Sequence, residues 1–425
     1  MNSALALGID VGTSGARVVA MAPDFSIVAQ ASAALSDFGD DWRDPAVWWR
    51  AVEHALGQVL AGIDRTRVRA LAVDGTSGTV LPVDRSGTPL AAALMYNDPV
   101  ADAAILAAIK AHAPAESAAH GATSGLAKLM QMQSAVKAGH ILHQADWIAG
   151  RFSGRFDVSD ENNALKTGYD PVARHWPDWT AQTGADTSLL PQVVPPGTPT
   201  GTLRAAAAER FGLPREVVVV SGTTDGCASF LATGATEPGD GVTALGSSLT
   251  IKLLSDAPVF APQYGIYSHR VGSGWLAGGA SNTGGKVLAQ FFTGERIAEL
   301  SKAIDPAVST GLDYYPLLAK GERFPIADPQ MQPRLAPRPD SDATFLTGML
   351  EGIAAIEALA YARLAELGAP KLRSVRSVGG GAKNPVWRAM RQARLGVPLL
   401  AALSEEAAAG TARLALAGGR DAGVF

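Results

Sequence analysis

The segment LALGIDVGTSGAR (Leu5–Arg17) decides the fold, because an apolar strand runs directly into a short loop of Gly, Thr and Ser. The same order returns at Val68–Val73, Val217–Val220 and Val242–Leu245, and three of the four loops carry an aspartate. Glycine leaves room for a ligand beside the backbone, while hydroxyls and N–H groups bind anionic or polyhydroxylated molecules. The pattern therefore indicates binding of a phosphate, its metal ion and a sugar.

Length and composition narrow the class of protein. The chain of 425 residues is too long for one ordinary core, so the length predicts two domains. Apolar residues make up 47% and charged residues 18%, as expected of globular domains. The net charge of −4 argues against a nucleic-acid-binding protein that relies on bulk positive charge. The single cysteine, Cys227, and the lack of a signal-peptide pattern or long uncharged apolar run predict a cytoplasmic protein without a membrane segment.

The first half of the chain alternates strands with helices, which predicts an α/β fold. Residues 4–32 predict a three-stranded meander, which leads into a helix over Pro45–Ile63. After the buried strand Val68–Val73, the segments Thr79–Asp84 and Pro89–Met95 predict a hairpin. Residues 100–150 are Ala-rich and predict helices, whereas residues 151–200 predict irregular structure.

The second half repeats the opening pattern. Gly234–Asp240 is rich in turn residues and predicts a hinge or domain boundary. After it, Val242–Leu245 and Thr250–Leu254 repeat the order of strand, Gly-hydroxyl loop and strand, a weak internal repeat that suggests two related halves. Helical periodicity and Ala-rich composition then predict helices over Phe345–Leu367, Pro385–Leu395 and Glu405–Gly418.

The loop after the first strand has the composition of a phosphate site. The tight turn Gly12-Thr13-Ser14 would point several N–H groups toward the β- and γ-phosphates, and Asp10 would ligate Mg²⁺ directly or through water. The alternative is an ordinary Gly-rich hairpin in which Asp10 caps the turn. The Gly-x-x-x-x-Gly-Lys pattern of a Walker loop is missing, so this is a different class of phosphate loop.

A second carboxylate has the setting of a general base. Asp225 follows the apolar strand Val217–Val220 and precedes a helix predicted over Cys227–Thr233. Held there, it could accept a proton from an attacking hydroxyl, a contribution of about 10²–10⁴-fold in rate. The alternative is that Asp225 is only the N-cap of that helix. Thr223 and Thr224 could likewise be cap residues or phosphate contacts.

Two further segments are candidate ligand contacts. Gly379-Gly380-Gly381 follows an apolar strand and would let adenine or ribose lie against the backbone; the alternative is a strained strand-to-helix turn. Trp42 lies in a predicted loop, where its ring could pack on the C–H face of a sugar, whereas Trp48 and Trp49 fall in the predicted helix and are assigned to the core. The histidines show no metal-ligand spacing, which argues against a zinc site.

Taken together, these segments resemble the FGGY-type carbohydrate kinases of the actin-like ATPase superfamily. Four segments carry the resemblance, in the family's order over almost the whole chain: Leu7–Arg17, Gly222–Gly226, Ala244–Ser248 and Val378–Trp387 with the following Leu395–Pro398. A closer resemblance is to the short plant and cyanobacterial sugar kinases described as xylulose-kinase-like and assigned as D-ribulose kinases. It rests on Asp74–Thr79, Gln144–Trp147, Asn163–Lys166, Gly311–Pro316 and Gly321–Pro325.

The resemblance implies a fold and a set of roles. The expected fold is two actin-like (ribonuclease-H-like) α/β domains, residues 1–232 and 233–425, with a ligand cleft between them. Asp10 and Thr13 would serve the phosphate and metal, Asp225 would be the catalytic base, and Ser77 with Asp10 and Asp225 would contact the sugar beside Trp42. Phosphate and nucleotide contacts would come from Gly12, Thr13, Ser14, Gly246, Ser247, Ser248, Gly380, Gly381 and Asn384.

The implied activity is transfer of the γ-phosphate of ATP, with Mg²⁺, to a primary hydroxyl of a ketopentose, with D-ribulose as the first candidate. The expected state is a monomer or homodimer without nucleic-acid or membrane partners. One departure bears on the sugar: many relatives have Trp-Asn-Asp before an Arg, where this chain has Met95-Tyr96-Asn97-Asp98-Pro99. D-Xylulose, L-ribulose and polyols therefore remain alternatives, as does an actin-like ATPase without sugar kinase activity.

Overall fold

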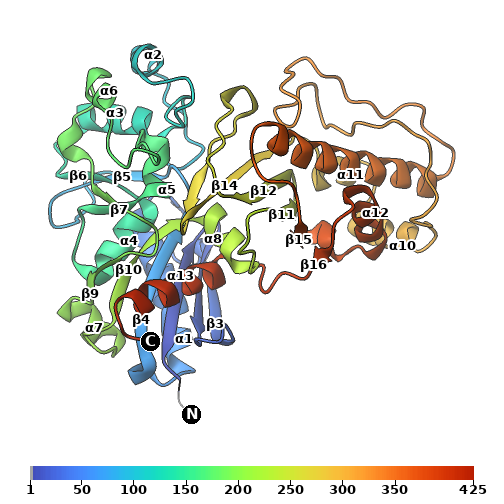
Figure 1. Ribbon diagram of the computed structural model, residues 1–425. Helices are drawn as coiled ribbons and strands as arrows, with labels where there is room; N and C mark the ends of the chain where they lie inside the picture. The colour runs from blue at the N-terminus through green and yellow to red at the C-terminus, as the bar shows by residue number, and fades with distance from the viewer. Residues whose placement is uncertain (1–2) are drawn as a thin grey trace. The chain divides into compact units, whose positions relative to one another are not determined.

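The computed structural model describes residues 3–425 and divides them into two compact units. Unit 1 contains the described residues up to Ala232, together with His269–Gly272 and Glu406–Phe425 (Figure 1). Unit 2 contains Thr233–Ser268 and Ser273–Glu405. The division predicted between residues 232 and 233 stays a prediction, and these units differ from it in placing the last helix of the chain in unit 1.

A mixed six-stranded sheet forms the centre of unit 1, with the order β3-β2-β1-β4-β10-β9. Neighbours β1, β4 and β10 are parallel, whereas β2, β3 and β9 run antiparallel to their neighbours. The strands are β1 (Leu5–Val11), β2 (Gly15–Met21), β3 (Ile27–Ala34), β4 (Val68–Gly75), β9 (Pro199–Thr202) and β10 (Val218–Thr224).

Helices cover both faces of this sheet, because its central strands are apolar on both sides. Leu7 and Ile9 face one core and Ala6 the other, as expected from the alternation of side chains along a strand. The first core includes side chains of α1 (Pro45–Ala61), α4 (Gln144–Ser153) and α7 (Ala205–Phe211), and the second includes those of α8 (Asp225–Ala232) and α13 (Ala407–Asp421).

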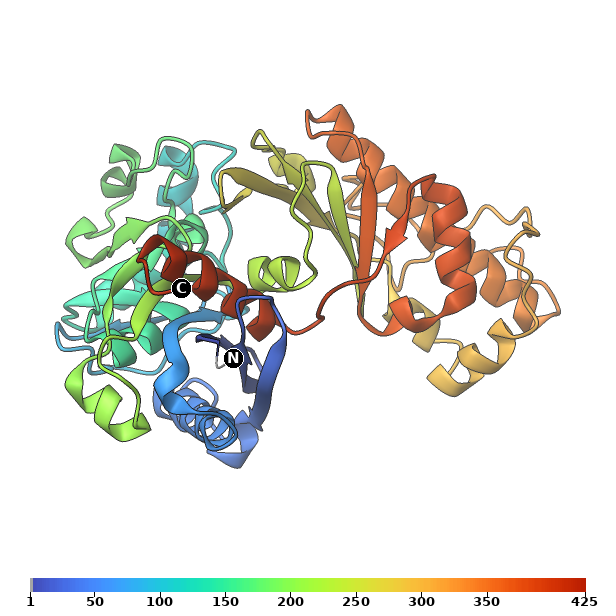
Figure 2. The same cartoon turned by 60° about the horizontal axis from the view of Figure 1, so that its bottom comes forward.

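Small residues allow α13 to lie unusually close to the sheet and to α8 (Figure 2). A Cβ at Gly8 of β1 would lie 2.0 Å from the Ala408 carbonyl oxygen, and one at Gly410 of α13 would lie 1.9 Å from the Ala228 carbonyl oxygen. Real Cβ atoms do not approach so closely, so both positions require glycine. The Ala-rich composition of this helix therefore serves close packing.

The rest of unit 1 consists of shorter helices and strands. They are η1 (Leu35–Asp37), η2 (Arg65–Arg67), β5 (Val80–Val83), α2 (Ala103–His112), α3 (Gly125–Ala135), β6 (His140–His143), β7 (Val158–Asp160), α5 (Glu161–Ala164), η3 (Leu165–Thr167), α6 (Asp178–Gln182), η4 (Thr187–Leu189), β8 (Gln192–Val194) and β13 (His269–Val271).

Unit 2 repeats the strand order of unit 1. Its sheet contains the run β14-β12-β11-β15-β16, in which β12 and β14 are antiparallel to their neighbours and β11, β15 and β16 are parallel. This matches β3-β2-β1-β4-β10 strand for strand, so the topology supports the repeat predicted from sequence. The strands are β11 (Asp240–Leu245), β12 (Leu249–Ser255), β14 (Gly274–Ala280), β15 (Ser374–Val378) and β16 (Leu399–Leu400).

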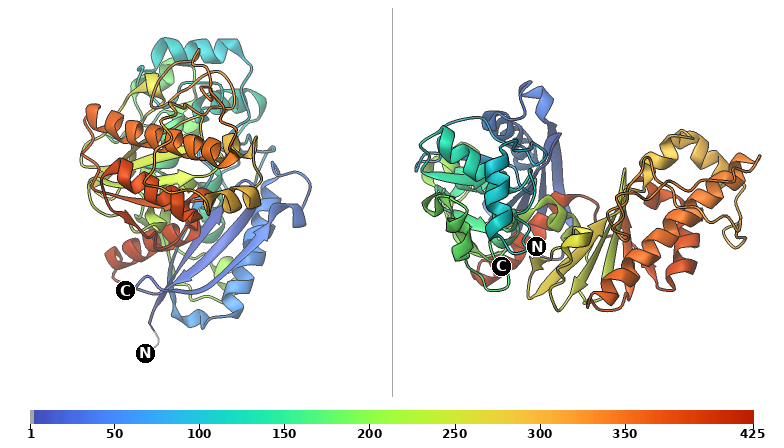
Figure 3. Two further views of the ribbon diagram at one scale, coloured as in Figure 1. Left: turned by 90° about the vertical axis from the view of Figure 1, so that its right-hand side faces the viewer. Right: turned by 90° about the horizontal axis from the view of Figure 1, so that it is seen from above.

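The long helix α11 (Asp342–Glu366) forms much of the unit 2 core and runs beside α12 (Pro385–Leu395), as Figure 3 shows. This helix is long and apolar enough to cross a membrane, but 67% of its apolar 18-residue stretch is buried, as in the core helix of a globular domain. A buried ion pair joins the two helices: Arg391 donates to Glu357 over 2.6 and 2.7 Å. The remaining elements are η5 (Pro262–Tyr264), α9 (Gly285–Ala289), α10 (Gly294–Ser301) and η6 (Gly380–Lys383).

Most of the strands and helices predicted from sequence are present, with two corrections. The segment Pro89–Met95 is not a strand: it touches β5 only through isolated bridges, and the strand that pairs with β5 is β6. The third Gly-hydroxyl loop is also shorter than predicted, because Ser221–Thr224 belongs to β10. Gly222 allows this, since a Cβ there would lie 1.7 Å from the Val73 carbonyl oxygen of β4.

Candidate active site

Three carboxylates meet at the carboxyl edge of the parallel strands of unit 1. Asp10 of β1 and Asp74 of β4 are paired across the sheet, and Thr223 of β10 is in turn the partner of Asp74. Asp225 follows two residues after Thr223, at the start of α8. Ligand sites of parallel sheets lie outside this edge, so the topology brings together the aspartates that the sequence singled out.

Asp74 is fully buried between Asp10 and the C-terminal helix. The hydroxyl of Thr411 on α13 donates to its Oδ2. Burial and the adjacent Asp10 carboxylate raise the pKa of Asp74 well above its usual value, and Asp225 adds to the rise. The surroundings of the buried Asp74 carboxyl thus favour its protonated form.

Asp10 is held at the mouth of the first Gly-rich turn. The turn is closed by a hydrogen bond from the Gly12 N–H to the Gly15 carbonyl over 3.0 Å, and Arg17 donates to Asp10 Oδ2 over 3.1 Å. Thr13 and Ser14 lie exposed at its tip. The turn thus has the backbone and hydroxyl groups expected of a phosphate contact.

Asp225 stands at the junction of β10 and α8, where its backbone is fixed by both elements. It is the first residue of α8, half-buried, and its Oδ1 accepts from the Gly226 N–H over 2.6 Å. Behind it, Thr223 Oγ1 accepts from the Asn162 side-chain amide over 2.9 Å. Thr223 is buried and occupied in this way, so its hydroxyl is part of the support of Asp225.

The loop after β4 carries Ser77. The hydroxyl of Thr76 donates to Gln144 Oε1 over 2.9 Å, and Thr76 and Thr79 are hydrogen-bonded to each other over 2.6 Å. These bonds fix both sides of Ser77, whose Oγ has no hydrogen-bond partner in the described protein. Lys166 donates to the Ser77 carbonyl over 3.4 Å. The Ser77 Oγ is itself buried and has unused hydrogen-bonding capacity.

Trp42 and Tyr96 are exposed aromatic residues of unit 1. Trp42 is 53% exposed, and its carbonyl accepts from the buried Trp48 Nε1 over 2.7 Å. The next residue, Arg43, makes a bidentate ion pair with Asp98: its Nη2 donates to Oδ1 over 2.7 Å and its Nε donates to Oδ2 over 3.0 Å. Asp98 belongs to the segment in which the family arginine is missing, so a cation from another part of the chain pairs with this carboxylate.

Unit 2 contains the last of the four Gly-hydroxyl loops, Gly246–Ser248, and a large cavity. Gly246–Ser248 connects β11 to β12 and is braced by the Gly285 N–H, which donates to the Gly246 carbonyl over 2.8 Å. Beside it lies a cavity of about 620 Å³. Its lining is predominantly apolar and consists of Leu245, Gly285, Leu288, Gly294, Ile297, Ala298, Ser301, Lys302, Leu350, Gly380, Gly381, Lys383, Asn384, Pro385, Val386 and Trp387.

The glycines predicted for the nucleotide do line this cavity. Gly379 has φ +87°, and a Cβ at Gly381 would lie 2.5 Å from the Trp387 ring, so both require glycine. Asn384 is the N-cap of α12: its Oδ1 accepts from the Val386 and Trp387 N–H groups, and its Nδ2 donates to Ser301 over 2.8 Å. Asn384 thus shapes the cavity wall.

Sequence comparison agrees with this architecture. The N-terminal domain of the FGGY family of carbohydrate kinases matches residues 5–232, and the C-terminal domain of the same family matches residues 241–418. The chain belongs to the FGGY family of carbohydrate kinases. The predicted resemblance is therefore confirmed at the level of the family, as is the two-domain α/β fold.

Individual relatives of this FGGY protein are distant. A xylulose kinase of Streptomyces coelicolor is 29% identical over 271 residues, which are 59% of this chain and 54% of the relative. An autoinducer-2 kinase of Yersinia enterocolitica is 27% identical over 300 residues, 64% of this chain and 56% of the relative. These matches span little more than half the length of the curated relatives.

Among solved structures, a xylulose kinase from Rhodospirillum rubrum superposes with a TM-score of 0.84 at 24% identity, covering 98% of this chain and 90% of that one. At this identity the likeness establishes the fold.

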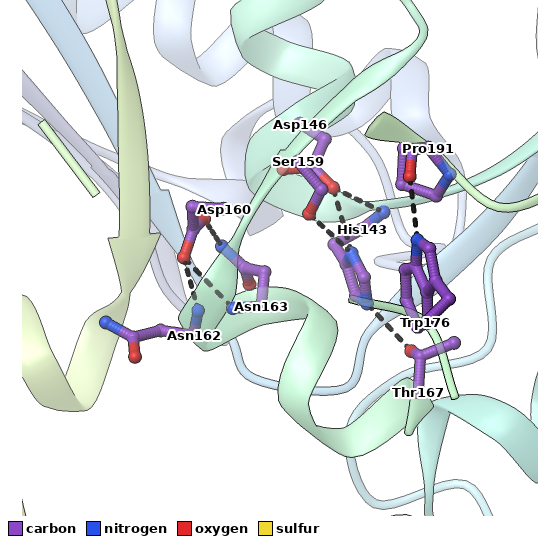
Figure 4. A network of polar contacts seen from close by, with 9 residues as sticks. All are labelled: His143, Asp146, Ser159, Asp160, Asn162, Asn163, Thr167, Trp176 and Pro191. Atoms are coloured by element: carbon purple, nitrogen blue, oxygen red, sulfur yellow. Dashed lines mark hydrogen bonds and ion pairs between the residues drawn. The ribbon is translucent and has the colours of Figure 1, made fainter. Parts of the chain in front are cut away.

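A network of polar contacts, mostly between buried side chains, lies in unit 1 of this FGGY chain, and Figure 4 shows its members. His143 is buried and hydrogen-bonded to Asp146 over 2.8 Å and to Thr167 over 3.0 Å. These contacts tie β6, α4 and η3 together. Its side chain therefore serves to hold these elements together.

The second part of the network is centred on Asp160 (Figure 4). Asp160 accepts from the backbone of Asn162 and Asn163 and, over 2.6 Å, from the Asn163 side chain. Burial and the nearby Asp146 raise the pKa of Asp160 to about 7. Since Asn162 also donates to Thr223, the network reaches the strand that carries Asp225.

The sequence did not single out three side chains of the site, namely Thr411, Arg43 and Lys128. Each meets its partner over a long stretch of chain: Thr411 and Asp74 are 337 residues apart, Arg43 and Asp98 are 55 apart, and Lys128 and Gly78 are 50 apart. No local sequence pattern predicts contacts between residues so far apart in the chain. Asp74 itself was visible as an aspartate beside a Gly-rich loop.

Proposed function

We propose that this protein is an ATP-dependent kinase that phosphorylates a primary hydroxyl of a ketopentose, with D-ribulose as the first acceptor to test. The observation that carries the proposal is the row of Asp10, Asp74 and Thr223-Asp225 along one edge of three parallel strands. Membership of the FGGY family supports it.

In this proposal, Asp225 is the general base. Its rigid junction between β10 and α8 keeps a half-buried carboxylate at the strand edge, where it accepts the proton of the attacking sugar hydroxyl as the bond to the γ-phosphorus forms and the bond to the ADP oxygen breaks. Ser77, with its unpaired Oγ, receives a sugar hydroxyl, and the exposed ring of Trp42 packs against the sugar.

The phosphates are assigned to the two Gly-hydroxyl turns. Gly12, Thr13 and Ser14 offer N–H and hydroxyl donors in unit 1, and Gly246, Ser247 and Ser248 offer the same groups in unit 2. The base and ribose are assigned to the cavity lined by Gly380, Gly381 and Asn384. Positioning and charge stabilisation provide most of the rate in such a transfer.

The carboxylates suit Mg²⁺, which prefers oxygen ligands and retains waters and substrate phosphates in its shell. Within residues 3–425, no group of three or more His, Cys, Asp or Glu side chains forms a metal cage. Asp10 on the strand edge is therefore the residue that would hold the ion, together with phosphate oxygens. When bound, Mg²⁺ would supply charge neutralisation for the phosphates.

The test is ADP release with Mg-ATP across a panel of ketopentoses and polyols, with Asp225→Ala as control. Stimulation by D-ribulose that is abolished in the variant would support both reaction and base. Stimulation by D-xylulose instead would shift the acceptor, a second candidate favoured by the xylulose kinase names of the relatives. Sugar-independent ATP hydrolysis with no stimulated activity would contradict the sugar kinase and favour an actin-like ATPase.

A further inference from the structure

Lys128, on α3, is a lysine without any exposed surface. Its Nζ donates to the Gly78 carbonyl over 2.7 Å and to the Met95 carbonyl over 2.6 Å. These acceptors lie 50 and 33 residues away along the chain. One ammonium therefore joins two separate loop segments to the N-terminal half of α3.

One of the two segments joined by Lys128 carries the candidate sugar contact Ser77, and the other is the segment Met95–Pro99 in which the chain departs from its relatives. Gly78 follows Ser77, whose hydroxyl lacks a partner. Met95 precedes Tyr96, which is 44% exposed, and Asn97, also exposed. The carbonyls of both segments are turned toward the buried ammonium, and Tyr96 and Asn97 are presented to the solvent.

Further bonds fix the same pair of segments to each other. The Tyr96 N–H donates to Thr79 Oγ1 over 2.9 Å, and the Met95 N–H donates to Asp98 Oδ2 over 2.8 Å. Asp98 in turn is paired with Arg43. The turn Met95–Asp98 is thus held from inside by Lys128 and from outside by Arg43.

A purely structural role would not call for an ammonium at this place. Burial lowers the pKa of Lys128 to about 8, although Asp98 partly offsets the fall. Taking a charge out of water is costly unless it is well paired, and an apolar side chain of similar size would avoid that cost. An apolar side chain such as that of methionine donates no hydrogen bond, so it could not hold two carbonyls of different loops at a fixed separation.

We propose that Lys128 is a positioning residue for the acceptor sugar, which sets the spacing between the Ser77 loop and the Tyr96–Asn97 turn. The inference rests on the proposed sugar kinase activity. Lys128 is buried and acts through these segments, so its loss changes the affinity for sugar while the nucleotide cavity of unit 2 stays intact.

The experiment compares Lys128→Met with wild type in steady-state ADP release, with sugar and ATP varied separately. We expect KM for the sugar to rise tenfold or more. KM for ATP should stay within about twofold, because Lys128 donates to Gly78 and Met95, which belong neither to the proposed phosphate turns nor to the cavity lining. Lys110→Met is the matched control, because Lys110 is an exposed lysine on the neighbouring helix α2 and should leave both values unchanged.

The outcomes separate the two proposals. Unchanged sugar KM in a folded, active Lys128→Met protein overturns the positioning role and leaves the kinase proposal standing. A wild type that shows neither sugar-stimulated ADP release nor sugar binding by calorimetry overturns both.

Asp98→Asn decides the case if Lys128→Met fails to fold. This variant weakens the Arg43 pair at the same turn and leaves α3 untouched. A rise in sugar KM alone supports the role of the spacing, whereas unchanged sugar KM overturns it.

Discussion

At the scale of single residues, the site depends on which carboxylate carries charge. Asp74 is buried, its pKa is raised by burial and by Asp10, and its hydrogen-bonding partner Thr411 lies 337 residues away along the chain. Asp10 lies at the opening of the phosphate turn, and Asp225 at the start of α8. The three aspartates thus have similar neighbours in the sequence but different environments in the fold, and we propose different roles for them.

Asp10→Asn tests the proposed metal contact. The amide keeps the size of the side chain but loses the charge, so we expect the Mg²⁺ concentration for half-maximal activity to rise about tenfold or more. The measurement is a Mg²⁺ titration at saturating sugar and ATP, with Asp24→Asn as control at an exposed turn of unit 1. A normal Mg²⁺ dependence would remove Asp10 from this role.

Lys128 predicts a pH dependence of stability. Because burial lowers its pKa from 10.5 to about 8, the folded state releases a proton that the unfolded state still binds between these pH values. The free energy of unfolding should therefore rise with pH in this window by up to about 3 kcal/mol relative to Lys128→Met. Urea unfolding of both proteins at pH 7.5 and pH 10 checks this, and equal changes would contradict it.

At the scale of elements, α12 connects helix capping to the cavity. Asn384→Ala removes the cap of α12 and the bond to Ser301, so we expect a loss of about 1 kcal/mol in stability together with a higher KM for ATP. Asp102→Ala removes the cap of α2 in unit 1 and should cost similar stability without any change in KM for ATP. Equal KM values for the two variants would show that Asn384 does not shape the nucleotide site.

The same helix is anchored by the buried pair of Glu357 and Arg391. Glu357→Ala leaves a buried guanidinium without its partner, which should cost about 3–5 kcal/mol. Glu357→Leu with Arg391→Met removes both charges and should recover most of that loss. Chemical denaturation of the single and double variants measures the difference, and additive losses would contradict the pairing.

The elements also show what a sequence can predict. The bounds of α12 were predicted correctly, because Asn384-Pro385 begins the helix and Gly396 ends it, and these signals are local. The partner of β5 was predicted wrongly, because Thr79–Asp84 and Pro89–Met95 lie close in sequence and suggested a hairpin, while the pairing strand β6 lies more than fifty residues further on. Among candidate site residues, motifs identified Asp10 and Asp225 but not Arg43 or Lys128, whose partners are remote.

At the scale of the whole molecule, both units are built on the same strand order, with antiparallel strands on one side and parallel strands on the other. In both units the turn after the first strand carries glycine and hydroxyl residues, Gly12–Ser14 and Gly246–Ser248, whereas the carboxylates lie at the parallel edge of unit 1 and the cavity lies in unit 2. The same strand order thus carries different side chains in the two units. The strand order alone therefore does not determine which unit holds the carboxylates and which the cavity.

The final helix leads to a prediction for the whole chain. A chain that ends at Glu405 lacks α13, and so exposes the apolar face of the first sheet that includes Ala6, Ala72 and Val220. We expect it to lose cooperative unfolding of unit 1 and to be cleaved there by proteases, while unit 2 keeps its protection. Limited proteolysis followed by mass spectrometry would show this, and a resistant unit 1 would contradict it.

The position of α13 also has a consequence for biosynthesis. During translation, the strands of the first sheet emerge early, but the helix that covers one of its faces follows only after all of unit 2 has been made. Domains usually fold in the order of synthesis. Here the face of the first sheet that α13 covers stays incomplete until then, so we expect unit 1 to complete its folding only when α13 has left the ribosome.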